Sequence, residues 1–222
     1  MLELALILGL GVFSVRAFNV NTEDIEIHKF GDKITKLWEI VHQGMRENRL
    51  LRAEKALLTI LKIDEKNAAA YNRLGILYAK QKEYKDAIDC FEIACSIEPT
   101  ASSLHNLGLI YYETENYQKA VIAFEEALKL EDSLAARHIA LAKALERLGH
   151  QKAMIEKLEH AAEIEPNKET FTILSRSYRS LGMAEKADVV DDKLSKLALP
   201  ATAGTRKSKI RQKVKRPRRV VV

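Results

Sequence analysis

The sequence contains few of the residues that build turns and cross-links. Its 222 residues include nine Gly, four Pro and two Cys, and aromatic side chains make up 6%. This scarcity of Gly and Pro argues against a β-sandwich or β-barrel, which needs frequent turns, and it excludes collagen and a low-complexity chain. The chain is 47% hydrophobic and rich in Ala, Leu, Lys and Glu, which favours a helical protein of one or two domains.

The two cysteines exclude a disulfide framework. Cys90 and Cys95 lie five residues apart in one apolar-periodic segment, which places them about 140° apart around a helix. Thiols in that arrangement cannot reach each other. Two reduced and packed thiols are consistent with a reducing compartment, and the sequence has no CxxC or zinc-binding pattern.

Motifs for catalysis are missing as well. The sequence has no HExxH, GxSxG, P-loop or GxGxxG motif, and its six histidines are scattered along the chain. Neighbouring carboxylates such as those of Glu125 and Glu126 are typical of a solvated helix surface. We therefore predict that the protein is not an enzyme and that it has no metal site and no cofactor.

Positive charge is concentrated near the C-terminus. The formal net charge is +5, and nine Lys and Arg residues between 206 and 219, with no acid among them, leave −4 for the remainder of the chain. Pro200 and Gly204 indicate a flexible linker, and we expect residues 201–222 to form a disordered basic tail. The predicted polyanion-binding residues are Arg206, Lys207, Lys209, Arg211, Lys213, Lys215, Arg216, Arg218 and Arg219.

Anionic lipid, nucleic acid or an acidic protein would suit this tail, and a solvated tail with no dedicated partner is the remaining alternative. Near a negative leaflet each Lys or Arg adds about 1 kcal/mol of binding free energy. Nucleic acid would be bound through its phosphates with a steep salt dependence. The tail has no interleaved aromatic residues for base stacking, and we favour an anionic membrane surface over nucleic acid.

Residues 1–18 form an apolar N-terminal segment. The apolar run, which Glu3 interrupts, spans about 15 residues before Arg16, against a lower limit near 17 for crossing a bilayer. Arg16 can snorkel to the interface. A secretory signal peptide is disfavoured because Glu3 stands where basic residues are expected and Arg16 spoils the cleavage site. A buried or partner-packed helix is disfavoured because the segment lacks an amphipathic face. We predict a membrane anchor, followed by a linker over residues 19–33.

The distribution of Lys and Arg predicts the topology of this anchor. Arg16, Lys29, Lys33 and Lys36 all follow the apolar segment, whereas only the α-amino group precedes it. The positive-inside rule then places the body of the protein on the cytoplasmic side of the membrane. The alternative is a soluble cytoplasmic protein.

Two central segments share one pattern. Each has a large residue, then Leu-Gly, Tyr, Ala, Phe and Ala, and Gly75 and Gly108 lie 33 residues apart. The matching residues of the first segment are Tyr71, Leu74, Gly75, Tyr78, Ala87, Phe91, Ala94 and Pro99. Those of the second are Leu104, Leu107, Gly108, Tyr111, Ala120, Phe124 and Ala127, with Asp132 in place of the proline.

This pattern resembles the tetratricopeptide repeat family, whose 34-residue unit is a helix–turn–helix. The resemblance implies an all-α, right-handed α-solenoid with a concave face. Weaker copies of the pattern extend it to about five units over residues 34–200. The predicted units are 34–67, 68–100, 101–134, 135–167 and 168–200.

The physics of helix packing agrees with this assignment. Small residues such as Gly108 recur where the paired helices must approach closely, and bulky residues such as Phe124 fill the groove beside them. Pro99 stops the second helix of its unit. Gly149 and Gly182 are predicted to mark the turn between the two helices of the last two units, because Gly tolerates positive φ.

The resemblance also implies that the first helix of each unit faces a ligand. One end of this predicted surface is aromatic and apolar and the other is basic, which would suit an extended peptide with an apolar anchor and acidic residues. Alternatively, the apolar members are core residues, the charges form a solvated face and Trp38 packs under the linker. The predicted partner-binding residues are Trp38, His42, Met45, Asn72, Ile76, His105, Leu109, Tyr112, Lys143, Arg147, Arg176 and Arg179.

One subfamily clamps the C-terminal carboxylate of chaperones, but of its clamp only Asn106 is in place here, so chaperone-tail binding is not predicted. We predict a scaffold or adaptor that binds a peptide or protein on its concave face at a membrane surface. The alternative is a soluble adaptor whose basic tail contacts RNA or ribosomes.

Overall fold

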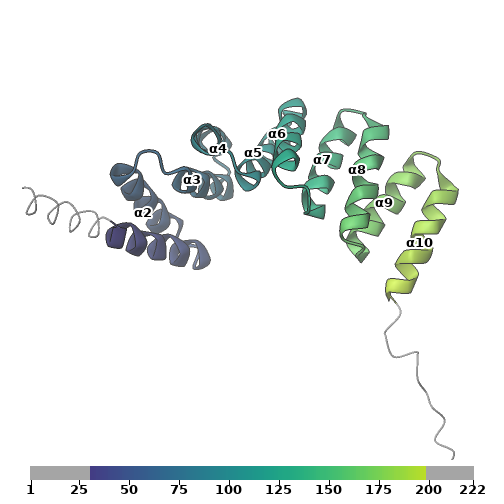
Figure 1. Ribbon diagram of the computed structural model, residues 1–222, viewed down its shortest axis with the longest axis horizontal. Coiled ribbons are helices and arrows are strands. Elements are labelled where there is room, and N and C mark those ends of the chain that lie inside the picture. Colours follow the sequence, from purple (N-terminus) through teal and green to yellow (C-terminus); the bar gives the residue numbers. More distant parts are fainter. Residues whose placement is uncertain (1–30, 199–222) are drawn as a thin grey trace, which may run out of the picture. The chain divides into compact units, whose positions relative to one another are not determined.

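The computed structural model describes residues 31–198, and this part of the chain is helical with no strand (Figure 1). Short turns connect successive helices, and the two helices of each helix–turn–helix pair run antiparallel. The helices are 31–46, α2 (Leu50–Ile63), α3 (Ala68–Gln81), α4 (Tyr84–Ile97), α5 (Ala101–Glu113), α6 (Tyr117–Leu130), α7 (Ala135–Arg147), α8 (Gln151–Ile164), α9 (Lys168–Ser180) and α10 (Ala184–Ala198). The prediction of an all-α fold of helix–turn–helix units is confirmed. The predicted anchor at 1–18, most of the linker at 19–33 and the basic tail at 201–222 lie outside the described residues.

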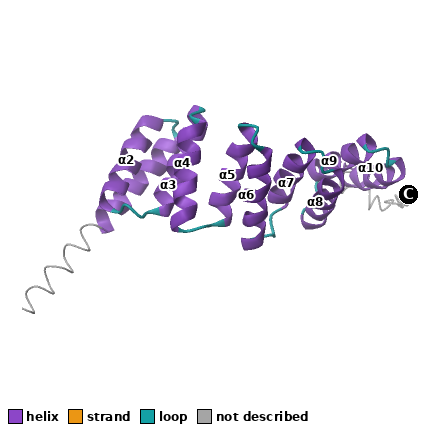
Figure 2. Cartoon of the chain, turned by 90° about the horizontal axis from the view of Figure 1, so that it is seen from above, coloured by secondary structure: helices purple, strands orange, loops and turns teal. Residues whose placement is uncertain are grey.

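The chain divides into two compact units after Ile164. In the first unit, α3 packs on α4, α5 on α6 and α7 on α8, while α2, α4 and α6 each contact the helix that follows. These hairpins stand side by side in sequential order (Figure 2). The second unit is the hairpin of α9 and α10. Contacts between neighbours in the sequence therefore build each unit, as in other repeat proteins.

The turn inside each hairpin contains one residue in the left-handed conformation. Gly149 and Gly182 have φ values of +76° and +73°, which confirms the prediction made for them. Asn48, Lys82 and Glu115 occupy the same place in the earlier hairpins, with φ between 56° and 65°. The left-handed residue thus recurs every 33 or 34 positions, although only the last two are the Gly that this conformation prefers.

Glycine lets the two helices of a hairpin come close together. A Cβ atom on Gly108 would lie 2.6 Å from the ring of Phe124, and one on Gly75 would lie 2.8 Å from the ring of Phe91. Both phenylalanines are almost completely buried. The close approach predicted for the Leu-Gly positions is therefore present in both central repeats.

A tyrosine on the first helix of each central repeat reaches back to the preceding repeat. The hydroxyl of Tyr78 donates a hydrogen bond to Glu54 at 3.2 Å, and the hydroxyl of Tyr111 donates one to Glu92. Burial, together with the nearby Glu54, raises the pKa of Tyr78 to about 12. The pKa of Tyr111 is raised in the same way, by burial and by Glu92. These bonds link successive hairpins at their edges.

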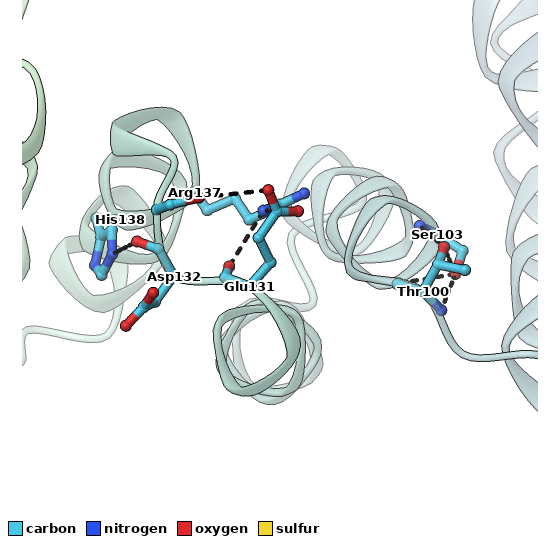
Figure 3. Close-up of polar contacts among 7 residues, drawn as sticks. Thr100, Ser103, Glu131, Asp132, Arg137 and His138 are labelled. Carbon is cyan, nitrogen blue, oxygen red and sulfur yellow. Dashed lines mark hydrogen bonds and ion pairs between the residues drawn. The ribbon is translucent and has the colours of Figure 1, made fainter.

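Two buried side chains of α7 secure the linker between α6 and α7. Here Asp132 replaces the proline of the repeat pattern, and α7 begins without a side-chain cap. Arg137 donates to the backbone carbonyl of Glu131 at 3.1 Å and pairs with its carboxylate at 2.8 Å. The Nε2 atom of His138 lies 2.8 Å from the carbonyl oxygen of Asp132 (Figure 3). Because a carbonyl oxygen only accepts, Nε2 carries the proton.

Candidate functional site

The first helices of consecutive hairpins lie next to each other in the first unit. Helix α3 contacts α5, and α5 contacts α7. The side-chain amide of Asn106 on α5 donates a hydrogen bond to the side-chain oxygen of Asn72 on α3, with 3.2 Å between the atoms. Helices α3, α5 and α7 carry seven of the predicted partner-binding residues, all within the first unit. We call the surface that bears these seven residues the inner surface. Asn72 serves in part to join two repeats.

Three predicted residues occupy the same place in successive helices. Ile76, Leu109 and Lys143 are each the ninth residue of α3, α5 and α7. Ile76 is partly buried, Leu109 is 39% exposed and Lys143 is exposed. Ile76 and Leu109 lie one turn beyond the bonded pair Asn72 and Asn106, at equivalent positions of two helices that contact each other. Ile76 is thus partly a core residue, whereas Leu109 is accessible to solvent.

An aromatic and cationic stack lies at the end of these helices. The ring centroids of Tyr112 on α5 and Tyr117 on α6 are 5.5 Å apart, in an edge-to-face arrangement. The guanidinium carbon of Arg147 on α7 lies 4.9 Å from the centroid of the Tyr117 ring. The structure thus brings Tyr112 and Arg147 together through Tyr117. Sequence reasoning missed Tyr117, although the recurrence of Tyr at 84 and 117, both first residues of a second helix, was an available signal.

The helix 31–46 carries three predicted residues, of which one is exposed and two are partly buried. Trp38 and Met45 are partly buried and pack against a cluster that includes Val41 and Leu57. His42 is exposed, and its ring centroid lies 5.8 Å from that of Trp38. Packing against this cluster is therefore part of the role of Trp38, while most of the linker under which it was alternatively predicted to pack lies outside the described residues.

His105 is largely enclosed by the fold. Its ring centroid lies 5.5 Å from that of Phe124, and its Nδ1 atom is buried with no hydrogen-bond partner among the described residues. Burial, and to a smaller extent the charge of Arg137, lower the pKa of His105. The imidazole is therefore neutral near pH 7. A neutral, enclosed ring contributes shape and not charge to the inner surface.

The predicted basic residues of the second unit differ in their surroundings. Arg179 on α9 pairs with Asp188 and Asp191 on α10, so its charge is compensated within the hairpin. The pKa of Asp191 is lowered by a hydrogen bond from Ser175 and then by Arg179. Arg176 is exposed beside a shallow pocket that also includes Thr172. Arg176 thus remains accessible, whereas Arg179 holds α9 to α10.

The described part of the chain contains no group of three or more His, Cys, Asp or Glu side chains placed to hold a metal ion. The rings of His138 and His160 lie 4.5 Å apart, edge to face, and Cys90 and Cys95 are free thiols. Among residues 31–198, no helix is long and apolar enough to cross a bilayer.

Comparison with known families identifies the class. Two models, both described as tetratricopeptide repeat, match residues 68–100 and 101–134. These residues contain the helices α3 to α6. Residues 68–134 therefore consist of two tetratricopeptide repeats, and the resemblance stated from the sequence is confirmed.

Solved structures with the same fold are numerous. A crystal structure of MamA protein is 21% identical, covers 77% of this chain and 98% of its own, and has a TM-score of 0.67. A structure described as MamA 41-end from Desulfovibrio magneticus RS-1 is 17% identical, with coverages of 75% and 95% and a TM-score of 0.68. YrrB, a TPR protein with an unusual peptide-binding site, is 22% identical, with coverages of 71% and 82% and a TM-score of 0.62. Among curated proteins no match is found.

Proposed function

We propose that this protein is an interaction scaffold that binds a peptide or a protein segment on its inner surface. Tetratricopeptide repeats support a role in protein–protein interaction. Proteins of this family are generally scaffolds without enzymatic activity, which supports the prediction that this chain is not an enzyme. YrrB, described as a TPR protein with an unusual peptide-binding site, shares the fold.

The observation that carries the proposal is the exposure of Leu109. Its side chain is 39% exposed in the middle of α5, between a partly buried Ile76 and a stacked Tyr112. Large apolar and aromatic side chains that are grouped and accessible are the typical anchors of a protein interface. A partner that covers Leu109 would remove this apolar surface from water.

A comparison of two variants tests the proposal. Leu109→Asp places a charge at the centre of the inner surface. Ile122→Asp places the same charge on α6, where Ile122 is 60% exposed. We expect proteins captured by the wild-type chain from a lysate, quantified by mass spectrometry, to be lost with Leu109→Asp and retained with Ile122→Asp. Equal capture by both variants would contradict binding at the inner surface, provided that both have wild-type circular dichroism.

We further propose, from the sequence, that the apolar segment 1–18 anchors the chain to a membrane with the repeats on the cytoplasmic side. Carbonate extraction of the membrane fraction tests this, since an anchored chain stays in the pellet.

The alternative is a soluble adaptor whose tail contacts RNA. Deletion of residues 206–222 should weaken co-sedimentation with anionic liposomes if the tail binds lipid, and with RNA if the alternative holds. Unchanged co-sedimentation with both would indicate a solvated tail.

A further inference from the structure

We propose that the segment recognised on the inner surface is an extended peptide in which an apolar side chain lies three residues from a single Asp or Glu. This inference rests on the proposed function and specifies its ligand. The apolar side chain would sit on Ile76 and Leu109, and the carboxylate would lie against Lys143 and Arg147.

The apolar half of the site follows from the arrangement of α3 and α5. The hydrogen bond between Asn72 and Asn106 fixes the register of the two helices, with 3.2 Å between donor and acceptor. One turn further along, Ile76 and Leu109 occupy equivalent positions of these two contacting helices. Ile76 is partly buried and Leu109 is exposed. Tyr112 lies one more turn along α5. These side chains together offer a contact for one large apolar residue.

The cationic half lies on α7. Lys143 and Arg147 are four residues apart, and they therefore share one face of the helix. Both are exposed, and neither has a carboxylate within ion-pair distance in residues 31–198. Arg147 is positioned by the ring of Tyr117, 4.9 Å away. Two adjacent cations that form no ion pair within the described residues are complementary to a carboxylate supplied by a partner.

The separation between the two halves sets the spacing in the ligand. Helices in contact have axes about 8–10 Å apart, and α5 contacts α7. An extended chain advances about 3.3 Å per residue, so about three residues span the distance from Leu109 to Lys143. Glu146, which is exposed one turn from Lys143, would repel a run of acidic residues. One carboxylate is therefore expected, and not an acidic tract.

Selection of short random peptides displayed on phage tests this inference with the full chain. We expect the wild type to enrich peptides with Leu, Ile or Phe three residues from Asp or Glu. Lys143→Glu should lose that acidic preference and select Lys or Arg at the same spacing. A synthetic peptide from the wild-type selection should bind Lys143→Glu at least about fivefold more weakly than the wild type. Lys55→Glu, which reverses an exposed charge on α2, should bind it normally.

The possible failures are distinguishable. In one outcome, the wild type selects apolar peptides without an acid at that spacing, and Leu109→Asp no longer selects them. This outcome would overturn the inference and leave the proposed function intact. The same acidic motif selected by Lys143→Glu would also overturn it. A wild-type chain that enriches no peptide over Leu109→Asp would overturn both. Thermal unfolding of each variant, followed by circular dichroism, shows whether the fold is retained.

Discussion

Single side chains decide how closely the helices of a repeat approach. Gly108→Ala should lower the free energy of unfolding by about 1–3 kcal/mol, because the new Cβ would lie 2.6 Å from the buried Phe124 ring. Alanine is the better helix former by about 1 kcal/mol, so a net loss would show that the clash dominates. Urea denaturation of the two proteins measures this difference in the free energy of unfolding. Gly31→Ala, where nothing lies within 4 Å of the new atom, is the control and should not destabilise the protein.

His138, the buried histidine of α7 that bonds to the α6–α7 linker, should make the stability of the protein depend on pH. Burial lowers the pKa of His138 from its ordinary value of 6.5, and His160 and Lys157 act in the same direction, against the bond to Asp132. The unfolded chain then binds more protons than the folded chain at acidic pH. The contribution of His138 is therefore complete above about pH 6.5 and is lost as the pH falls through the folded pKa.

We expect the melting temperature to fall between about pH 7.5 and pH 5, and to fall less in His138→Asn, whose amide can still donate to the Asp132 carbonyl. His105, whose pKa is also lowered by burial, contributes in the same direction and accounts for part of the remaining slope. His150→Asn, at an exposed position, is the control. An identical pH slope in wild type and His138→Asn would contradict the assignment.

Among elements, the turns inside the hairpins show a conformational cost that the sequence does not reveal. Glu115 adopts φ +60°, a conformation that costs a non-glycine residue about 1 kcal/mol or more. Glu115→Gly should therefore raise the free energy of unfolding by up to about 1 kcal/mol, after the greater flexibility of glycine in the unfolded chain is counted. Glu115→Ala keeps a Cβ and should not show this gain. Equal stabilisation by Gly and Ala would assign the effect to the lost carboxylate instead.

The helices and their pairing were predictable because the small and bulky residues of the repeat pattern mark the positions at which two helices contact each other. Gly108 against Phe124 and the turns at Gly149 and Gly182 follow from side-chain size and from the conformational freedom of glycine. The turn residues Lys82 and Glu115 were not predictable, since nothing in an exposed charged residue indicates a positive φ. The buried Arg137 was also missed, because charged side chains are expected at the surface unless a partner is known.

The sequence predicted which residues lie on the surface of the candidate site, but it did not predict the side-chain contacts that these residues make. The register placed Leu109 and Lys143 on one surface, and the structure places them at equivalent points of α5 and α7. The pairing of Arg179 with Asp188 and Asp191 could not be foreseen, because it depends on how α10 packs against α9. Ligand recognition at these positions remains a prediction that the proposed variants test.

At the scale of the whole molecule, the division after Ile164 predicts that the first unit folds without the second. Its hairpins are held by contacts between neighbouring helices, from α2 to α8. In such repeat proteins stability is approximately a sum over repeats and the interfaces between neighbours. A chain that ends at Ile164 should keep the helical circular dichroism of its own residues and unfold cooperatively. Its urea m value should fall in proportion to the surface that is no longer buried.

The matched control for this truncation ends inside a hairpin instead of between two. A chain cut after Leu148 retains α7 but loses α8, the helix that α7 contacts within its hairpin. Helix α7 carries several buried apolar residues, Leu141 and Leu145 among them. In the chain cut after Leu148, the apolar face of α7 is exposed, which should lower the melting temperature and promote aggregation. The chain cut after Ile164 should show neither effect. If the chain ending at Ile164 were the less stable of the two, the unit boundary would be wrong, and the last hairpin would be required for folding of the first four.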